Sequence, residues 1–371
     1  MARVGMSGLE EELARAREQV RGRSPAYERA LRLLPDVLAG PPGRFVEAAW
    51  EHRRFFAWYD RPLLLLAALR NDALAEGPRH PLWDGLAAAE ADPAAVTPGV
   101  LADALDGSRE GVFDALAHRT VQTNETSRAI AWLWPAALAR AGDEEHPLAL
   151  ADVGASAGLN LVADALPSVW VAADGGPLEL AREVRPVARL GLDPAPLDVF
   201  RAADARWLWA CIWPGERARE ERLAAAMTAF QAARVRPDAP VLVPVSAASV
   251  PARLDLLSGA QMHALVLAYQ TVMHDYLEPA ERTAYEAGMR GWLGAHPSGR
   301  ALWVELEPVD HAAPGSPPGA LVAHVRAPWG ELRDLELARC TLHPLRLEVH
   351  RGAVEELQTH LVGEAHAGVR A

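Results

Sequence analysis

A short turn of small residues directly after an apolar run constrains this chain more than any other feature of its sequence. The run 148–153 has the length and composition of a buried strand, and Gly154, Ser156 and Gly158 follow it before a segment of helical pattern. Small residues in a strand–turn–helix let the main chain approach a ligand, and backbone N–H groups at the helix start attract polar groups. The turn therefore predicts a nucleoside-cofactor site. The candidate cofactor-binding residues in it are Asp152, Gly154, Ser156, Gly158 and Asn160.

The sequence before this turn has the pattern of helices alone. Proline and glycine separate segments in which apolar residues recur at helical spacing. The first expected helix begins near Ser7, which has capping-box spacing to Glu10, and the second begins where Ser24 precedes Pro25. Further helices are expected at 44–59, 62–72, 97–106 and 110–118. We therefore predict a helical cap domain over residues 1–144.

From residue 125 onward, apolar runs alternate with helical segments. Strands are expected at 148–153, 168–173, 186–192, 240–244, 263–268 and 301–306, and helices at 125–141, 157–165, 203–212, 218–233, 247–258 and 277–294. Such alternation implies crossover connections and a parallel sheet with helices on both faces. Residues 320–326 and 335–342 then form an expected antiparallel pair. The prediction for residues 145–371 is an α/β fold with a mostly parallel sheet and a terminal antiparallel hairpin, as in the Rossmann-like fold of class I methyltransferases.

Composition argues against several classes of protein. The net charge is −12, and the 37 basic residues, all arginine, are dispersed and form no basic stripe for a nucleic acid. The longest apolar run, 62–69, is far shorter than the ~20 residues of a membrane span. Cys211 and Cys340 lie far apart, and the 13 histidines lack metal-ligand spacing. We expect a cytoplasmic protein with no metal, nucleic acid or membrane partner, and leave open a protein partner or a homo-oligomer.

A cofactor site of this type also needs a carboxylate at the end of the second strand, to bind ribose hydroxyls. Asp174 follows the expected strand 168–173 and lies 20 residues after Gly154. Asp193 follows the expected strand 186–192 and precedes Pro194. We favour Asp193, because the glycines after Asp174 are typical of an ordinary turn.

A polar segment precedes the apolar helix that leads to the glycine turn. Gln122, Asn124, Glu125 and Arg128 occur within seven residues. Because buried polar groups need partners, these side chains form either a structural network or the wall of a pocket. We predict the pocket, with Gln122, Asn124 and Arg128 binding substrate and Glu125 in catalysis. The alternative is that Thr123 or Asn124 only caps the helix.

A second polar segment follows the expected strand 263–268. Ligands in open α/β sheets bind beyond the carboxyl ends of the strands, so this segment should face the reactive end of a cofactor. Tyr269 and Gln270 are candidates for binding substrate, and His274, as a base near neutral pH, and Tyr276 for catalysis. Glu305 and Glu307 alternate at another strand end, where one of them reaches the pocket or both are exposed.

The motifs together resemble a bacterial family of unknown function that is similar to S-adenosylmethionine (SAM) methyltransferases. The resemblance covers nearly the whole chain. It is carried by Ser24–Tyr27, Gln122–Glu125 with Arg128, Val153–Leu161, Arg189–Asp193 with Pro196 and Asp198, Asp204–Trp207 with Trp213 and Pro214, and Tyr269–Met273 with Tyr276. Asp152 stands where the family more often has glutamate, which keeps the carboxylate. Ser156 stands where a standard cofactor loop has glycine. The resemblance implies a methyltransferase fold and SAM as cofactor.

We therefore predict a small-molecule-modifying enzyme, foremost a SAM-dependent methyltransferase. One alternative is a SAM-independent enzyme on the same fold that catalyses displacement, cyclisation or elimination in secondary metabolism. Another is a serine hydrolase, because a G-x-S-x-G turn also marks a nucleophile elbow; Ser156 would then act with Asp310 and His343. The last alternative is a non-catalytic scaffold.

Overall fold

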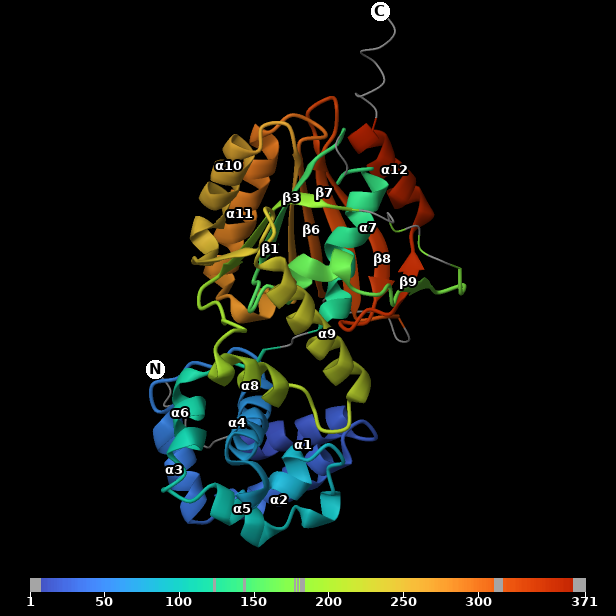
Figure 1. Cartoon of the computed structure of the whole chain (residues 1–371). Coiled ribbons are helices and arrows are strands. Elements are labelled where there is room, and N and C mark those ends of the chain that lie inside the picture. Colours follow the sequence, from blue (N-terminus) through green and yellow to red (C-terminus); the bar gives the residue numbers. More distant parts are fainter. Residues whose placement is uncertain are drawn as a thin grey trace, which may run out of the picture. The chain divides into compact units, whose positions relative to one another are not determined.

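The computed structural model describes residues 8–122, 125–142, 145–176, 178, 180, 184–309 and 316–362 (Figure 1). The chain divides into two compact units. The helical unit comprises residues 1–124 and 198–223, and the sheet unit comprises residues 125–197 and 224–371.

Helices alone form the described part of the helical unit. They are α1 (Leu9–Val20), α2 (Pro25–Leu38), α3 (Pro41–Trp50), α4 (Asp60–Glu76), α5 (Pro98–Ala104), α6 (Glu110–His118), α8 (Ala202–Ala210) and the start of α9 (Arg217–Ala233), with short turns η1 (Gly77–Arg79), η2 (Trp83–Ala87) and η3 (Pro93–Ala95). Every residue from Leu64 to Arg70 in α4 is buried, as expected for a helix that is apolar around its circumference. Pro25 opens α2 as predicted, but the Ser24 hydroxyl donates to the Pro214 carbonyl instead of capping the helix.

The helical unit differs from the expected range 1–144, because α8 and the start of α9 fold with it. The reason lies in the buried side chain of Arg70. Its guanidinium donates hydrogen bonds to the carbonyls of Trp209 and Ile212 and pairs with Glu220 at 2.7 Å. A buried guanidinium needs such partners, and here they come from a distant stretch of sequence. Residues 125–142, by contrast, belong to the sheet unit.

One nine-stranded sheet forms the centre of the described part of the sheet unit. Its strands are β1 (Leu148–Val153), β2 (Val171–Ala172), β3 (Pro186–Asp193), β4 (Val241–Pro244), β5 (Leu265–Thr271), β6 (Ala301–Pro308), β7 (Gly319–Arg326), β8 (Leu332–Cys340) and β9 (Arg346–Val349). The helical elements are η4 (Thr126–Ala129), α7 (Ile130–Leu138), η5 (Leu159–Ala165), η6 (Ala247–Ser249), α10 (Val250–Ala260), η7 (His274–Tyr276), α11 (Pro279–Ala295), α12 (Arg351–Val362) and the end of α9.

The strand order is β2-β9-β8-β7-β6-β5-β1-β3-β4. The five strands β4, β3, β1, β5 and β6 run parallel, and β7, β8 and β9 continue the sheet as an antiparallel meander. The predicted α/β class, the mostly parallel sheet and the terminal hairpin are therefore confirmed. β3 and β4 lie on one side of β1, and the later strands β5 and β6 lie on the other side, so the strand order reverses at β1. Ligands in open α/β sheets bind at such a switch point.

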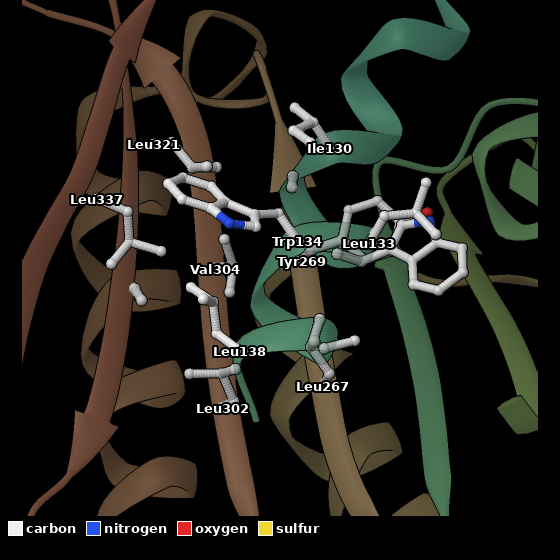
Figure 2. Close-up of a cluster of buried hydrophobic side chains, with 14 of the residues drawn as sticks. Ile130, Leu133, Trp134, Leu138, Leu267, Tyr269, Leu302, Val304, Leu321 and Leu337 are labelled. Carbon is white, nitrogen blue, oxygen red and sulfur yellow. The ribbon is translucent and has the colours of Figure 1, made fainter. Parts of the chain in front are cut away.

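Two apolar cores cover the two faces of the sheet. On one face, Leu148 and Leu150 pack in a cluster with α7 and α12. Figure 2 shows part of this cluster, with Trp134 and Leu138 from α7 against Leu302 and Val304 from β6. On the other face, Ala149 and Ala151 pack in a cluster with α10 and α11 (Figure 1). Burial on both faces explains why β1 has a continuous apolar sequence.

Several predicted elements differ from the structure. The expected helix 44–59 is the shorter α3, which ends at Trp50. The expected strand 168–173 contains only two strand residues, which pair with β9 at the edge of the sheet away from β1. The expected helix 157–165 is the 3-10 segment η5. Two backbone carbonyl groups of η5 accept hydrogen bonds from side chains. Trp132 Nε1 donates to the Asn160 carbonyl, and the Arg189 guanidinium donates to the Leu161 carbonyl.

Candidate functional site

The turn after β1 adopts left-handed backbone angles at three alternate positions. The φ angles are +76° at Gly154, +52° at Ser156 and +69° at Gly158. Glycine adopts this region without steric cost, whereas serine does not. This geometry gives the physical reason why glycine is the usual residue at the position of Ser156. The turn is therefore built as the sequence predicts, with local strain at its centre.

Asp193, at the end of β3, holds this turn. Its Oδ2 accepts a hydrogen bond from the Ser156 N–H at 2.8 Å, and its Oδ1 accepts one from the Ala195 N–H at 2.8 Å. Burial raises the pKa of Asp193, and these two bonds oppose that effect. Each carboxylate oxygen can accept a further hydrogen bond. Asp174, the other candidate acid, is exposed in a turn after the edge strand β2 and is not next to β1.

Asp152 and Tyr269 are register partners on the neighbouring strands β1 and β5. Both side chains are buried, and the Tyr269 hydroxyl is close enough to the Asp152 carboxyl to act on it as a hydrogen-bond donor. Among the described residues, however, neither Asp152 Oδ2 nor Tyr269 Oη has a partner in good hydrogen-bond geometry. Burial raises the pKa of Asp152 to about 8, an effect that the nearby Tyr269 hydroxyl opposes and the charge of Asp193 reinforces. Burial and the charge of Asp152 together raise the pKa of Tyr269 well above its usual value.

Further buried polar atoms without partners lie in the segments around these strand ends. In the described part of the chain they include Ser156 Oγ, Asn160 Oδ1 and Ser127 Oγ. Ser127 belongs to η4, which packs against η5, the segment of Asn160. Buried polar atoms are rarely left unsatisfied, so each needs an explanation such as a bound ligand or water. Four of the predicted site residues, Asp152, Ser156, Asn160 and Tyr269, therefore supply free hydrogen-bonding capacity near the switch point.

The structure divides the polar segment before α7. Gln122 belongs to the helical unit, where its N–H lies 3.4 Å from Cys211 Sγ and its side chain donates to the Thr120 carbonyl. Asn124 lies outside the described residues. Glu125 is buried in the sheet unit and caps η4 by accepting the Ser127 N–H. Arg128 is also buried and donates to the Leu342 carbonyl. Capping is thus one role of this segment, performed by Glu125. Thr123, like Asn124, lies outside the described residues.

A buried network fills the other face of the sheet at the end of β5. Gln270 Oε1 accepts hydrogen bonds from Trp303 Nε1 at 3.2 Å and from the Tyr285 hydroxyl. Because an indole N–H can only donate, this contact fixes the orientation of the Gln270 amide. Gln270 Nε2 then donates to Glu307 Oε1 at 3.0 Å and to His274 Nε2 at 2.9 Å.

This orientation also fixes the tautomer of His274. Since Nε2 accepts from Gln270, the proton of the neutral imidazole lies on Nδ1. Burial lowers the pKa of His274, only partly offset by Glu305, and so favours the neutral form. The imidazole of His274 is therefore neutral, as a general base must be, but its basic nitrogen Nε2 already accepts a hydrogen bond from Gln270. Tyr276 is half-buried in the same segment, η7.

Glu305 and Glu307 are not an exposed pair. Glu307 is buried, and Glu305 lies between His274 and His324, with Glu305 Oε1 3.0 Å from His324 Nε2. His324 Nδ1 in turn lies 2.7 Å from Asp334 Oδ1. Burial alone would lower the pKa of His324, but the two carboxylates raise it. Sequence reasoning missed His324, Asp334 and Tyr285, because no local pattern brings residues of β7, β8 and α11 together.

The hydrolase alternative lacks an activated nucleophile in this geometry. Ser156 Oγ is buried and has no hydrogen-bond partner in the described part of the chain, whereas an activated serine needs a base within hydrogen-bond reach. His343 Nδ1 lies 3.9 Å from Glu125 Oε2, and Asp310 lies outside the described residues. Within those residues, moreover, no group of three histidine, cysteine or acidic side chains is arranged to hold a metal ion. No helix among them is long and apolar enough to cross a membrane.

Comparison with known proteins places the chain in a family. Residues 11–348 match a family described as "Uncharacterized protein conserved in bacteria (DUF2332)". The chain belongs to this family. The match covers most of both units, including residues 154–158 of the glycine turn. No curated protein and no solved structure matches the chain.

Proposed function

We propose that the sheet unit is a Rossmann-like methyltransferase domain that binds SAM beyond the carboxyl ends of β1, β3 and β5 and acts on a small molecule. The observation that carries this proposal is the set of buried polar atoms without partners around the turn: Asp152 Oδ2, Ser156 Oγ, Asn160 Oδ1 and Tyr269 Oη. They lie where the strand order reverses, which is where such sheets bind ligands.

The charge of this region favours a cationic cofactor over a dinucleotide. Asp152 and Asp193 lie close enough for the charge of one to raise the pKa of the other. The turn itself, residues 154–158, has no basic side chain for a pyrophosphate. SAM has a positive sulfonium and a positive ammonium group. A positive group beside Asp152 favours its ionised form, so binding would lower the pKa that burial raises, and the carboxylates then attract the cofactor. The residues present therefore fit this cofactor.

Each candidate residue has a role in this proposal. Asp193 binds the ribose hydroxyls through its remaining acceptor capacity, and Asp152 with Tyr269 binds the ammonium end. Gly154 and Gly158 keep the backbone accessible. SAM supplies an activated methyl group when bound. The chain's own contribution is alignment of the substrate nucleophile, since near-attack geometry accounts for much of such a rate enhancement. In the sheet unit, the candidates for contact with the substrate are Glu125, Arg128, Gln270, His274 and Tyr276. Gln122 and Asn124 fall in the helical unit and stay predictions from the sequence alone.

Isothermal titration with SAM and S-adenosylhomocysteine tests the proposal. We expect binding to the purified protein, weakened about 10- to 100-fold in Asp193→Asn, because a hydrogen bond to a charged group contributes about 1.5–3 kcal/mol. Asp174→Asn is the matched control, since Asp174 also follows a strand but is exposed at the far edge of the sheet. It should bind as the wild type does. No binding by a folded wild-type protein would refute the cofactor proposal and favour a SAM-independent enzyme.

A further inference from the structure

The segment after β5 is held in a strained conformation. Val272 has a φ of +53°, which is unusual for a β-branched residue, and its N–H donates to the Leu306 carbonyl at 2.9 Å. Backbone strain of this kind persists only where the surroundings enforce it, and it concentrates at functional segments.

The carboxylate of Glu307 supplies that constraint. Its Oε1 accepts the Met273 N–H at 2.9 Å and Gln270 Nε2 at 3.0 Å, and its Oε2 accepts the His274 N–H at 3.3 Å. All three donors thus converge on one side chain from residues 270–274. An ionised carboxylate can accept from all of them, whereas a protonated one must present a donor at one oxygen.

This segment also contacts the glycine turn. A Cβ atom at Gly154 would lie 3.4 Å from Met273 Cγ, so the Met273 side chain packs directly against the turn. A change in the position of Met273 or His274 would therefore alter the surroundings of the first residue of the turn.

Several titratable groups surround Glu307. Glu305 lies on the same strand, Tyr285 faces it from α11, and His274 Nδ1 lies 4.0 Å from its Oε2. Glu286, Arg282 and Asp275 act on His274 in turn. Burial lowers the pKa of His274. Burial also raises the pKa of Glu307 to about 7, and the charge of Glu305 adds to this effect, so Glu307 titrates near neutral pH.

We propose that Glu307 is a positioning residue that works as a proton-operated latch on residues 272–276. When ionised, it holds Met273 beside the glycine turn and binds the His274 N–H. A proton from solvent binds at Oε2, which has the single and longer hydrogen bond, and removes the negative charge and one lone pair that the His274 N–H faces. The bond to the His274 amide is then weakened, while Met273 and Gln270 keep their bonds to Oε1. This inference does not depend on the identity of the cofactor.

Amide NMR of the full chain labelled with ¹⁵N-histidine and ¹⁵N-methionine tests the latch. The chain has only 13 histidines and 6 methionines, so the spectra are sparse. Between about pH 5.5 and about pH 8.5 the His274 amide should titrate with a midpoint of about 7, and the Met273 amide should move less. A His274 amide that does not respond over this range would overturn the proposal.

Two variants separate Glu307 from the His274 imidazole. Glu307→Gln should abolish the titration of the His274 amide. If the midpoint persists in this variant, the imidazole is the titrating group and the latch is refuted. Glu305→Gln is the matched control on the same strand. It should keep the titration but lower its midpoint, because the charge of Glu305 raises the pKa of Glu307. Because Glu305 also raises the pKa of His274, the imidazole ¹⁵N signals of the labelled His274 separate the two groups even if Glu307→Gln fails to fold. They should remain those of a neutral ring while the amide titrates. Imidazole signals that titrate with the amide, or an unchanged or higher midpoint in Glu305→Gln, contradict the proposal.

Discussion

The carboxyl group of Asp152 lies among the apolar side chains of β1, and among the described residues it forms no ion pair. Its pKa of about 8, raised by burial, exceeds the 3.8 of an ordinary aspartate. Between these two pH values the folded chain holds a proton that the unfolded chain has lost. The free energy of unfolding must then fall as the pH rises through this range.

Asp152→Asn should remove this part of the pH dependence. At about pH 8.5 we expect the variant to be more stable than the wild type by at least ~1 kcal/mol, because the cost of ionising a buried carboxyl is gone. At about pH 5 the two should differ little. Urea unfolding at both pH values measures this. Glu307 will still make the free energy of unfolding of this variant depend on pH. The control Asp174→Asn should unfold with the same pH dependence as the wild type. Equal stability losses at both pH values would instead point to a purely steric effect.

The glycine turn and β3 approach each other closely at the scale of secondary-structure elements. A Cβ atom at Gly191 would clash with Leu242 and lie 3.1 Å from the Ala155 Cβ. Leu242 lies on β4, the neighbour of β3, so the space is closed on two sides. The conformation of the turn therefore depends on a glycine in the adjacent strand as well as on its own glycines.

Gly191→Ala should destabilise the protein by about 1–3 kcal/mol, the usual cost of overpacking a core. Gly259→Ala in α10 is the matched control, because nothing lies within 4 Å of its added Cβ. Alanine there should be neutral or stabilising by up to ~1 kcal/mol. Thermal or denaturant unfolding of both variants provides the comparison. A neutral Gly191→Ala would show that Leu242 and the turn can move apart.

At the scale of the whole molecule, the helical unit is discontinuous in sequence. Arg70 of α4 depends on Trp209, Ile212 and Glu220 for its buried hydrogen bonds. The buried Ser24 hydroxyl likewise depends on the Pro214 carbonyl. A fragment that ends at residue 124 would keep only the Leu86 carbonyl as a partner of Arg70 and would expose the surface of α4 that packs against α8.

We therefore expect the fragment 1–124 to show no cooperative thermal unfolding by circular dichroism. In the full chain, Arg70→Met should retain more stability than Glu220→Ala, because the latter leaves the buried cation partly unpaired while the former removes it. A fragment that unfolds cooperatively at a temperature near that of the full chain would show that residues 198–223 are dispensable for this unit.

Local sequence patterns predicted much of the fold. Apolar periodicity placed α4, β1, β5 and β6 close to their observed bounds, and Pro25 marked the start of α2. The small residues 154–158 predicted a tight turn, and the preference for Asp193 over Asp174 agrees with their positions in the sheet. These features depend on residues a few positions apart, so a single sequence contains them.

Only the tertiary structure decided which distant groups meet. It placed Asp174 at the far edge of the sheet, paired Arg70 with residues more than 130 positions away, and fixed the tautomer of His274 through Trp303 and Gln270. It also showed that, among the described residues, buried polar atoms without hydrogen-bond partners surround the turn 154–158 that follows Asp152 and Val153. Strand order and buried hydrogen-bond partners depend on long-range packing, in which each polar group must find a partner wherever the chain brings one. The local pattern thus predicts the elements, and long-range packing decides which side chains form a site.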